Sequence, residues 1–497
     1  MPDHRKTKPA ARVLLVESNN MSKWVGTAMP YEVHIPPLGL MYLASYARTV
    51  LPGVEFRIVE SSLSAPDLDS SDDDRFIRIL NEFQPDVVGI RSISFFLEEL
   101  QRIATLVRAH SDATIVAGGP IVQAYKQRLF QEVPELDIAV KGEGEKVFAD
   151  FLSGAPVPSI PGLLFRTNDG VVENADQSEV ADIDSLPFPA YDLIDLDQYQ
   201  RQLSYAYNHR RQGVLLTSRG CAYHCTFCFT HWKGIRLRSA ANIFEEIKEL
   251  NGKHGVDDFY IVDDIFNVDS RRSIELFDLI IAAGLKLRLY FVNGLRADIT
   301  SEEFVDRALQ AGAVWFTYAV ESGTDEIQRL VKKRLDLEKT KRIVAYTQRQ
   351  NVAVNISTMY GFPTETRELA QRTLDWLSEL PKPSLLPYHF CLRFFPGCAI
   401  NDQALDAGWD PERLRLTSRF SYNDMPLGTP TLTKHDMFDI QLEYHRRFGM
   451  SNPAAVDAAV RTLRSIGYTD TEIVHMYSVL KRKVIQNVGD LISAGGN

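Results

Sequence analysis

Short apolar runs alternate with segments of helical spacing through the first third of the chain, and this alternation limits the folds open to it. The expected strands are Val13–Val16, Phe56–Val59, Asp86–Ile90, Thr114–Ala117 and Asp137–Val140. The expected helices are Leu38–Arg48, Arg75–Phe83, Phe96–His110, Val122–Val133 and Lys146–Leu152. Apolar strands separated by helices are typical of a parallel sheet covered on both faces. The pattern therefore predicts a doubly wound α/β domain over residues 1–153.

The same alternation returns over residues 213–400. Strands are expected at Val214–Thr217, Asp258–Val262, Leu287–Asn293, Val314–Val320, Val352–Tyr360 and Pro387–Phe394. Helices are expected at Asn242–His254, Arg271–Ala283, Glu302–Ala311, Thr340–Gln350 and Glu368–Leu380. These elements predict a partial (β/α)6 barrel, a class that places its chemistry at the carboxyl ends of the strands.

Two further regions complete the organisation. Residues 154–212 form a proline-rich linker that contains a hairpin signal, with strands at Leu163–Thr167 and Val171–Glu173. Residues 401–497 have mostly helical spacing, with helices expected at Met437–Phe448, Asn452–Ile466 and Asp470–Ile485. We interpret the last region as a helical C-terminal part that closes the barrel.

The charge balance argues against two classes of partner. The 497 residues include 55 Lys and Arg and 65 Asp and Glu, which gives a net charge of −10. Nucleic acids and anionic membranes both need clustered positive charge, so neither is expected as a partner. No run approaches the roughly 18 apolar residues that a membrane span needs. We expect a cytoplasmic protein.

Three of the 5 cysteines share one loop, directly after the first expected barrel strand. Cys221, Cys225 and Cys228 can supply three thiolates to a four-iron cluster and leave its fourth iron open. One alternative is a zinc site completed by His224 or His231, and another is three cysteines buried as small apolar residues. The concentration of scarce cysteine in one loop favours a metal centre.

Small and turn-forming residues follow several strands of the N-terminal sheet. Singly they are turn residues, whereas together on one rim they favour a binding site, since such sheets bind ligands beyond the carboxyl ends of their strands. The candidates are Ser92, Ser94, Gly118, Gly119, Gly142 and Glu143.

The spacing of the three cysteines, with Phe227 just before the last one, resembles the radical S-adenosylmethionine (SAM) superfamily. This resemblance implies a [4Fe–4S] cluster that binds SAM and cleaves it reductively to a 5′-deoxyadenosyl radical. It also implies a small-molecule substrate and an electron donor such as flavodoxin or ferredoxin. By position, Phe227, Asp263, Asp264, Glu321 and Ser322 are then the expected SAM contacts.

Further strand ends extend the resemblance. Asp263-Asp264 stands where the superfamily commonly has a Gly-Gly-Glu segment that holds the SAM amino group. Glu321-Ser322-Gly323 resembles its ribose-contacting position. The turn Gly361-Phe362-Pro363-Thr364-Glu365 resembles the glycine-proline-glutamate turn near which adenine packs.

The first domain resembles the cobalamin (vitamin B12)-binding domain that is fused to some radical SAM cores. The motifs that carry this resemblance are Pro36-Pro37-Leu38-Gly39-Leu40, Ala117-Gly118-Gly119-Pro120, Gly142-Glu143-Gly144-Glu145 and the linker Leu186-Pro187-Phe188-Pro189. Two positions depart from the family: Ile121 stands where histidine is common, and Cys398 follows Pro396-Gly397 where threonine is usual.

Three functions remain open from the sequence. The resemblance implies cobalamin-dependent methylation of an unactivated carbon in a natural product or sugar. Some relatives keep the domain without using cobalamin, which leaves radical dehydration or deoxygenation of an aminoglycoside-like sugar as the second possibility. The third is a zinc-stabilised binding module without enzymatic activity. Cys391 and Cys398, near the last barrel strand, are candidate hydrogen-atom or proton donors, with packing as the default interpretation.

Overall fold

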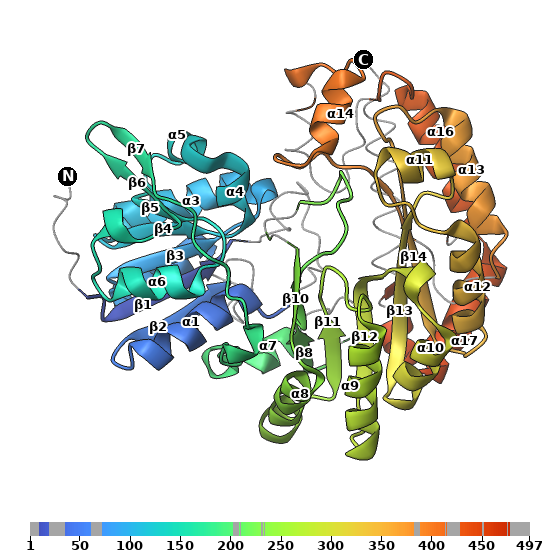
Figure 1. The fold of residues 1–497 in the computed structure, drawn as a ribbon, viewed down its shortest axis with the longest axis horizontal. Coiled ribbons are helices and arrows are strands. Elements are labelled where there is room, and N and C mark those ends of the chain that lie inside the picture. The colour runs from blue at the N-terminus through green and yellow to red at the C-terminus, as the bar shows by residue number, and fades with distance from the viewer. Residues whose placement is uncertain are drawn as a thin grey trace. The chain divides into compact units, whose positions relative to one another are not determined.

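The computed structural model describes residues 9–18, 35–60, 72–201, 208, 210–229, 232, 234–381, 388–412, 414, 428–449, 452–474 and 476–477. The chain divides into two compact units, the first extending to Gln198 and the second beginning at Tyr199 (Figure 1).

The first unit is built on a seven-stranded sheet with the order β2-β1-β3-β4-β5-β6-β7. Its strands are β1 (Arg12–Glu17), β2 (Glu55–Glu60), β3 (Val87–Arg91), β4 (Thr114–Gly118), β5 (Ile138–Val140), β6 (Leu163–Thr167) and β7 (Gly170–Glu173). The strands β1 to β5 are parallel, which confirms the doubly wound sheet. The predicted hairpin adds β6 and β7 antiparallel at one edge, so part of the linker belongs to this sheet.

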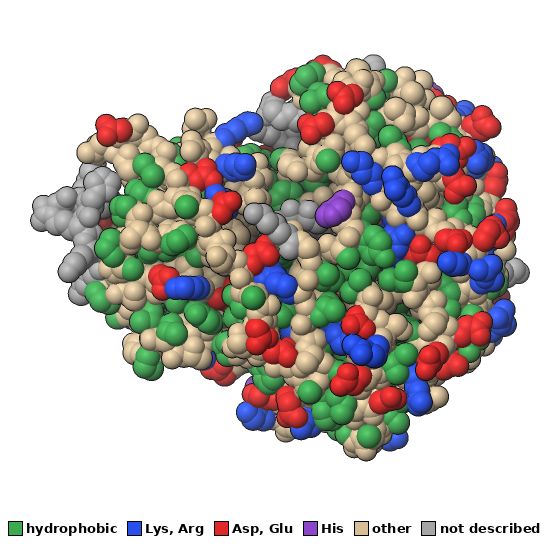
Figure 2. Space-filling view, viewed as in Figure 1, with side chains coloured by type: hydrophobic (Ala, Val, Ile, Leu, Met, Phe, Trp, Pro, Cys, Tyr) green, Lys and Arg blue, Asp and Glu red, His purple; other side chains and the backbone are tan. Residues whose placement is uncertain are grey.

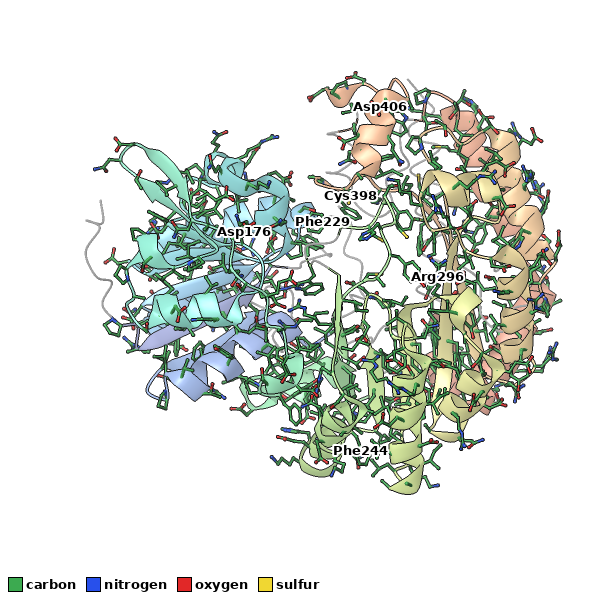
Figure 3. All side chains as sticks on the ribbon, viewed as in Figure 1. Asp176, Phe229, Phe244, Arg296, Cys398 and Asp406 are labelled. Atoms are coloured by element: carbon green, nitrogen blue, oxygen red, sulfur yellow. The ribbon has the colours of Figure 1, made fainter. Side chains whose placement is uncertain are left out.

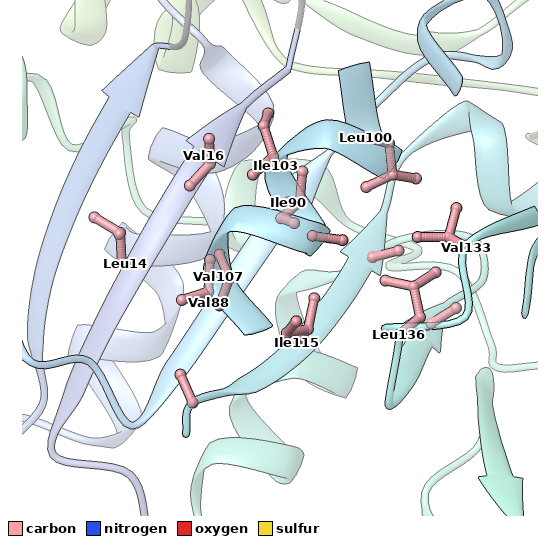
Figure 4. Packing of buried hydrophobic residues seen from close by; sticks show 14 of the residues in the cluster. Leu14, Val16, Val88, Ile90, Leu100, Ile103, Val107, Ile115, Val133 and Leu136 are labelled. Atoms are coloured by element: carbon pink, nitrogen blue, oxygen red, sulfur yellow. The ribbon is translucent and has the colours of Figure 1, made fainter. Parts of the chain in front are cut away.

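Helices cover both faces of this sheet because its strands are apolar on both sides. The helices are α1 (Leu38–Val50), α2 (Asp72–Phe83), α3 (Leu97–His110), α4 (Pro120–Tyr125), α5 (Leu129–Glu132) and α6 (Glu145–Leu152). Leu14 and Val16 of β1 pack with α2 and α3, as Figure 4 shows for α3. The alternate residues Val13 and Leu15 pack with α1 and α6. Successive side chains of a strand point to opposite faces of the sheet, so β1 contributes to a hydrophobic core on each face.

One helix prediction of the first unit was wrong in its continuity. The segment Val122–Val133 is not one helix, because α4 ends at Tyr125 and α5 begins at Leu129. Lys126 between them has φ +48°, a left-handed conformation that breaks the helical path.

The second unit is built on a six-stranded sheet with the order β15-β14-β13-β12-β11-β8, parallel throughout. The strands are β8 (Gln212–Leu215), β11 (Asp258–Ile261), β12 (Arg288–Leu295), β13 (Ala313–Glu321), β14 (Ala353–Tyr360) and β15 (Tyr388–Cys391). This confirms the partial barrel. The predicted strand Val214–Thr217 extends too far, since β8 ends at Leu215 and Thr217 lies in the short connection after it. The next residues, Ser218–Gly220, form a separate strand, β9, that pairs with β10 (Ile235–Leu237).

Helices lie on the outer side of this barrel (Figure 1). They are α8 (Ala240–His254), α9 (Ser270–Ala282), α10 (Glu302–Gln310), α11 (Asp325–Leu330), α12 (Leu337–Gln348), α13 (Arg367–Ser378), α16 (Lys434–Phe448) and α17 (Pro453–Ser465). A further helix, α14 (Ile400–Asp406), lies at the rim instead, next to the cysteine loop. Side-chain caps set several starts: Ser239, Ser301 and Thr366 each accept a hydrogen bond from a backbone N–H of the first turn. The expected helices at 437–448 and 452–466 are confirmed, whereas the one at 470–485 lies mostly outside the described residues.

The amino-terminal end of the barrel is filled by a tyrosine cluster. The rings of Tyr260 and Tyr290 stack with their centres 4.6 Å apart. Asn208 accepts a hydrogen bond from the Tyr260 hydroxyl at 3.1 Å and donates to the hydroxyls of Tyr290 and Tyr468, both at 3.4 Å. Because Tyr468 comes from the C-terminal region, that region helps to close this end of the barrel, which leaves the opposite rim for chemistry.

Candidate functional site

The three clustered cysteines lie on the loop that leaves the carboxyl-terminal side of β8, after the short strand β9. Cys221 and Cys225 are partly exposed and Cys228 is exposed. The backbone N–H of Cys228 donates to the carbonyl of Cys225 at 3.1 Å, so these two residues close one turn of the loop. The loop thus presents all three predicted metal ligands at the barrel rim, where barrel enzymes place their chemistry.

The electrostatic surroundings favour one thiolate of the trio. The Cys228 thiol donates a hydrogen bond to Cys225 and lowers the pKa of Cys225 to about 7, with a further contribution from the positive charges of Lys333 and Arg296. The same hydrogen bond raises the pKa of Cys228, and burial raises that of Cys221. Thiolates are the form that binds metal, so the loop is prepared for the first ligand bond.

The donor set of this loop fits an iron–sulfur cluster with one open iron, because its three cysteines are the ligands such clusters take. In the described part of the chain, no three His, Cys, Asp or Glu side chains, these three cysteines included, are gathered closely enough to hold a metal ion, so the thiols must move together when a cluster binds. His224, a proposed fourth zinc ligand, is exposed, and the other candidate, His231, lies outside the described residues.

Asp263 supports the beginning of the cysteine loop from inside the protein. Its carboxylate accepts hydrogen bonds from the Thr217 backbone N–H at 2.6 Å, from the Thr217 hydroxyl, and from the Ser218 hydroxyl at 2.9 Å. Asp263 is only 2% exposed, and this burial raises its pKa. Of the two predicted SAM-contacting aspartates, Asp264 is the one exposed to solvent.

A buried guanidinium completes this support. Arg272 of α9 donates to the carbonyl of Thr217 at 2.8 Å and to that of Phe266 at 3.0 Å. Its charge acts on the Asp263 carboxylate and partly offsets the cost of burying it. Thr217 is therefore held by a carboxylate and a guanidinium directly before the cysteine loop.

Arg296, just after β12, holds the middle of the loop. Its guanidinium lies over the Tyr223 ring, 4.1 Å from the ring centre. The same group donates to the carbonyls of Lys333 at 2.9 Å and Arg334 at 3.2 Å, and it pairs with Asp298. Figure 3 labels Arg296 on the barrel. Because the guanidinium is planar and has several N–H donors, it can contact the Tyr223 ring and these backbone carbonyls at the same time.

Thr226 fastens the far end of the loop. Its backbone N–H donates to the carbonyl of Val331 at 3.0 Å, and its carbonyl accepts from the N–H of Ile400 at 2.8 Å. Its hydroxyl donates to Gln403 of α14 at 2.9 Å. The loop is thereby tied to α14, an element well separated from it in sequence.

An apolar cluster lies beside this end of the loop and includes Cys398, which is 4% exposed. Phe227, a predicted cofactor contact, and Phe229 pack against the cluster; Figure 3 labels Phe229 and Cys398. Burial raises the pKa of Cys398 to about 11, and that of Cys391 to about 12. Both thiols are therefore neutral near pH 7, and the position of Cys398 supports its packing role.

Glu321 ends β13 in an unusual conformation. Its φ is +69°, in the left-handed region that side chains other than glycine rarely adopt, and the pairing with β14 shifts register here. Its carboxylate accepts a hydrogen bond from the Lys333 ammonium at 2.8 Å, and both side chains are about one-tenth exposed. Strained backbone of this kind often accompanies functional sites.

Ser322, the neighbouring predicted contact, uses its hydroxyl inside the protein. The Ser322 oxygen lies 3.0 Å from the Thr324 hydroxyl and 3.1 Å from the Thr373 hydroxyl of α13. Ser322 is fully buried. The structure therefore places Glu321 at the rim and Ser322 beneath it, as part of the turn that positions Glu321.

The turn after β14 is organised by a buried acid. Glu365 is fully buried and accepts hydrogen bonds from the backbone N–H groups of Gly361 at 2.6 Å and Phe362 at 3.3 Å. Gly361 has φ +88°, which explains glycine at this position. Burial raises the pKa of Glu365 to about 8, so near neutral pH much of it carries a proton.

In the first unit, several predicted rim residues are engaged with the protein itself. The Ser92 hydroxyl donates to the carbonyl of Ile93 at 3.1 Å, and Glu143 accepts from the Val180 backbone N–H at 2.7 Å. Gln177 donates to the carbonyl of Lys141, beside Gly142, at 2.8 Å. These contacts shape the loops at the carboxyl ends of β3 and β5.

The β4 end of this rim is built from small residues. Nothing lies within 4 Å of the position that a Cβ on Gly118 would take, whereas a Cβ on Gly119 would meet the Ser92 carbonyl at 2.7 Å. Ser94 is buried near the end of β3. In this strand order the switch point lies between β1 and β3, where such sheets bind their ligand. The fold therefore fits a ligand at this rim.

Sequence reasoning missed two residues of the barrel rim. Lys333 belongs to no motif, and its approach to Glu321 arises from the turn after α11, in which Lys332 and Arg334 both have positive φ. Arg296 follows a strand, so a search of every strand end for polar side chains could have found it.

Comparison with known families agrees with the two-unit organisation. The model of the radical SAM superfamily matches residues 215–377. The model of the B12 binding domain matches residues 26–152. The first match contains the cysteine loop, and the second covers most of the parallel sheet of the first unit.

Two curated relatives are methyltransferases. An uncharacterized methyltransferase of Pyrococcus horikoshii is 27% identical over 356 residues, which cover 69% of this chain and 73% of the relative. The cytidylyl-2-hydroxyethylphosphonate methyltransferase of Streptomyces wedmorensis is 29% identical over 397 residues, again covering 69% and 73%. Another relative, the anaerobic magnesium-protoporphyrin IX monomethyl ester cyclase of Cereibacter sphaeroides, is 24% identical and covers 75% of this chain.

Solved structures show the same fold. The radical SAM methyltransferase TsrM of Kitasatospora setae, solved with cobalamin and a [4Fe–4S] cluster, superposes with a TM-score of 0.70 at 19% identity. That comparison covers 95% of this chain and 99% of TsrM. The cobalamin-dependent radical enzyme OxsB gives a TM-score of 0.62 at 17% identity and covers 96% of this chain and 72% of OxsB.

No helix within the described ranges is both long enough and apolar enough to span a membrane. On the face shown in Figure 2, acidic and basic side chains are interspersed.

Proposed function

We propose that this chain, which joins a B12-binding domain to a radical SAM domain, is a cobalamin-dependent methyltransferase that methylates an unactivated carbon of a small molecule. The observation that carries the proposal is the presence of a three-thiol loop at a barrel rim together with a B12-type sheet in one chain. The two methyltransferase relatives support methyl transfer as the outcome.

When bound, a [4Fe–4S] cluster supplies the electron that cleaves SAM, and cobalamin carries the methyl group. In this proposal Cys221, Cys225 and Cys228 hold the cluster, while Asp263 and Arg296 keep their loop in place. Preorganised supports of this kind reduce the rearrangement that binding requires.

Two rim acids are proposed to orient SAM. Glu321 is positioned by its strained backbone and by Lys333, and Asp264 is exposed beside the cysteine loop. A carboxylate accepts hydrogen bonds from hydroxyl and ammonium groups, both of which SAM carries. The first unit is proposed to hold cobalamin at the rim near Gly118 and Gly119.

The other functions find less support. Radical dehydration with an unused cobalamin domain shares the barrel chemistry, but the two methyltransferase relatives named above favour methyl transfer. A zinc-stabilised module without enzymatic activity is not supported by the relatives named above, which are described as enzymes.

The test begins with anaerobic reconstitution of the full chain with iron, sulfide and cobalamin. We expect about four irons per chain, retained cobalamin, and 5′-deoxyadenosine when SAM and a flavodoxin-type reductant are added. Mass analysis of reactions with candidate small molecules and methyl-labelled SAM then detects a labelled product. The matched control replaces Cys221, Cys225 and Cys228 together by alanine.

Three results would contradict the proposal. Retention of iron and SAM cleavage by the triple variant would remove the cluster assignment. Turnover that proceeds at full rate without cobalamin would exclude cobalamin-dependent methyl transfer and favour dehydration. Zinc instead of iron in anaerobically purified protein would favour the binding module.

A further inference from the structure

The inner face of the barrel carries a buried amide that lacks a hydrogen-bond partner. Asn355 on β14 is 1% exposed, and neither its Oδ1 nor its Nδ2 has a hydrogen-bond partner in the structure as described. A buried amide without a partner destabilises a protein, so such groups usually have a structural or functional reason.

Register and packing show which way Asn355 points. Tyr318 bonds to Thr347 of α12, and Phe316 packs on Phe291, so these residues of β13 face the outer helices. The intervening Thr317 therefore faces inward, and Thr317 pairs with Asn355 in the parallel ladder. Asn355 thus lies on the inner face of the barrel.

Solvent reaches the inner face above Asn355. Ser357 and Met359, the next inward residues of β14, are partly exposed, whereas the outward residues Thr358 and Tyr360 are buried. The neighbouring strands repeat this pattern, since Ala319 of β13 and Tyr388 of β15, which pair with Ser357, are also partly exposed. Val262 and Val292, directly after β11 and on β12, are partly exposed as well.

The inner face is uncharged, with an aromatic base. Tyr260 and Tyr290 form the base together with Trp315, whose indole N–H donates to the Thr317 hydroxyl at 3.1 Å. From this layer up to the rim, the inward residues of the described strands include no Asp, Glu, Lys or Arg. The acids Glu321 and Asp264 stand only at the rim. A charged group placed deep in the barrel would therefore lack a counter-ion.

We infer that the inner face of the barrel binds an uncharged, largely apolar part of the substrate that carries a carboxamide or lactam, with Asn355 as its specificity-determining contact. An amide pairs with another amide through one donated and one accepted hydrogen bond, which satisfies both orphaned atoms of Asn355. This inference rests on the proposed function, because it concerns the substrate of that site. It disfavours a cationic aminoglycoside as the buried part.

The experiment uses the full chain, reconstituted anaerobically with its cluster and SAM, and small probes observed by ligand-detected NMR. The probes share one ring: benzamide, its cationic isostere benzamidinium, the anion benzoate, and acetophenone, which has an acceptor but no donor. We expect wild-type protein to bind benzamide at least about tenfold more tightly than each of the other three. Equal or tighter binding of benzamidinium would overturn the inference.

The variants Asn355→Leu and Asn355→Ala assign the contact. We expect both to lose the preference for benzamide over acetophenone, and Asn355→Ala adds no volume should leucine prevent folding. The control Asn251→Leu removes an amide that has partners, since Asn251 donates to the Val256 carbonyl at 3.0 Å. That control should lower the melting temperature and keep the preference.

The melting temperatures give an independent readout. Removal of an unpartnered amide should cost less stability than removal of a partnered one, so the Asn355 variants should melt above Asn251→Leu. If the Asn355 variants keep the benzamide preference, the amide serves only internal structure and the inference fails. If the preference holds but no SAM cleavage occurs with any substrate, the proposed function fails and the inner-face site remains.

Discussion

The Asp263 carboxylate accepts a hydrogen bond from the backbone N–H of Thr217 at 2.6 Å, which ties the end of β11 to the residue that precedes the cysteine loop. Both residues are almost fully buried, and Arg272 contacts Thr217 from a third element. The loop that presents the thiols thus begins from a point held by several hydrogen bonds.

Replacing Asp263 with asparagine should loosen the cysteine loop. The amide keeps one oxygen for the Thr217 N–H, but the NH2 group in place of the second oxygen cannot accept the hydrogen bonds of the Thr217 and Ser218 hydroxyls. We expect a loss of about 1–3 kcal/mol in the free energy of unfolding. Iron content after reconstitution should fall, and the electron paramagnetic resonance signal of the reduced cluster should broaden.

The control for this variant is Asp258→Asn. Asp258 lies at the other end of β11, is equally buried, and pairs with Arg288 and the Tyr290 hydroxyl. It should cost comparable stability and leave iron content and the cluster signal unchanged. Equal iron content in both variants would show that Asp263 has no special role in the loop.

Replacing Arg296 with lysine should speed the loss of iron to a chelator several-fold. Lysine keeps the charge but not the planar group that lies over Tyr223 and donates to two backbone carbonyls. Cation–π contact of this kind contributes about 0.5–2 kcal/mol. Arg288→Lys, at the opposite end of β12, is the control, and similar iron-release rates in the two variants would contradict the prediction.

Replacing Cys398 with alanine should lower the free energy of unfolding by about 1 kcal/mol, because the thiol packs in the apolar cluster with Phe394 and Trp409. Cys391 is only partly buried and lies outside this cluster, so Cys391→Ala should cost less stability. Both variants should keep normal SAM cleavage and product formation. Loss of product with unchanged stability in either variant would instead make that thiol a hydrogen-atom or proton donor.

Replacing Glu365 with glutamine should flatten the pH dependence of stability. The folded-state pKa of about 8 lies above the ordinary value of 4.5, so the folded chain holds a proton that the unfolded chain has released between these values. The stability from protonated Glu365 is fully present below about pH 4.5 and is lost as pH rises through about 8. Glutamine resembles the neutral acid and does not titrate.

Urea unfolding at pH 5 and pH 8 measures this difference. Wild type should lose on the order of a few kcal/mol more than Glu365→Gln between the two values. The control Glu326→Gln changes an exposed acid on α11, paired with Arg372, and should leave the wild-type pH dependence in place. Parallel losses in wild type and Glu365→Gln would show that Glu365 is ionised throughout.

Much of the architecture could be predicted from local patterns. The five parallel strands of the first sheet and the six of the barrel follow from apolar runs of strand length, because burial on both faces selects such residues. The continuous helix predicted at Val122–Val133 was wrong, because the left-handed backbone of Lys126 separates α4 from α5. Side-chain spacing does not show such a change in backbone conformation. The roles of the predicted cofactor contacts remain predictions, although the structure distinguishes the exposed Asp264 from the buried Asp263 and Ser322.

The sequence by itself determined the order of the strands along the chain, the spacing of the three thiols, and therefore the end of the barrel at which they gather. Only the tertiary structure decided which side chains support them: the pairing of Lys333 with Glu321, of Arg296 with Tyr223, and of Asp263 with Thr217. Strand spacing is a local property that each segment shows alone. Contacts between loops depend on how the whole sheet twists and on where each turn returns the chain, and no single segment contains that information.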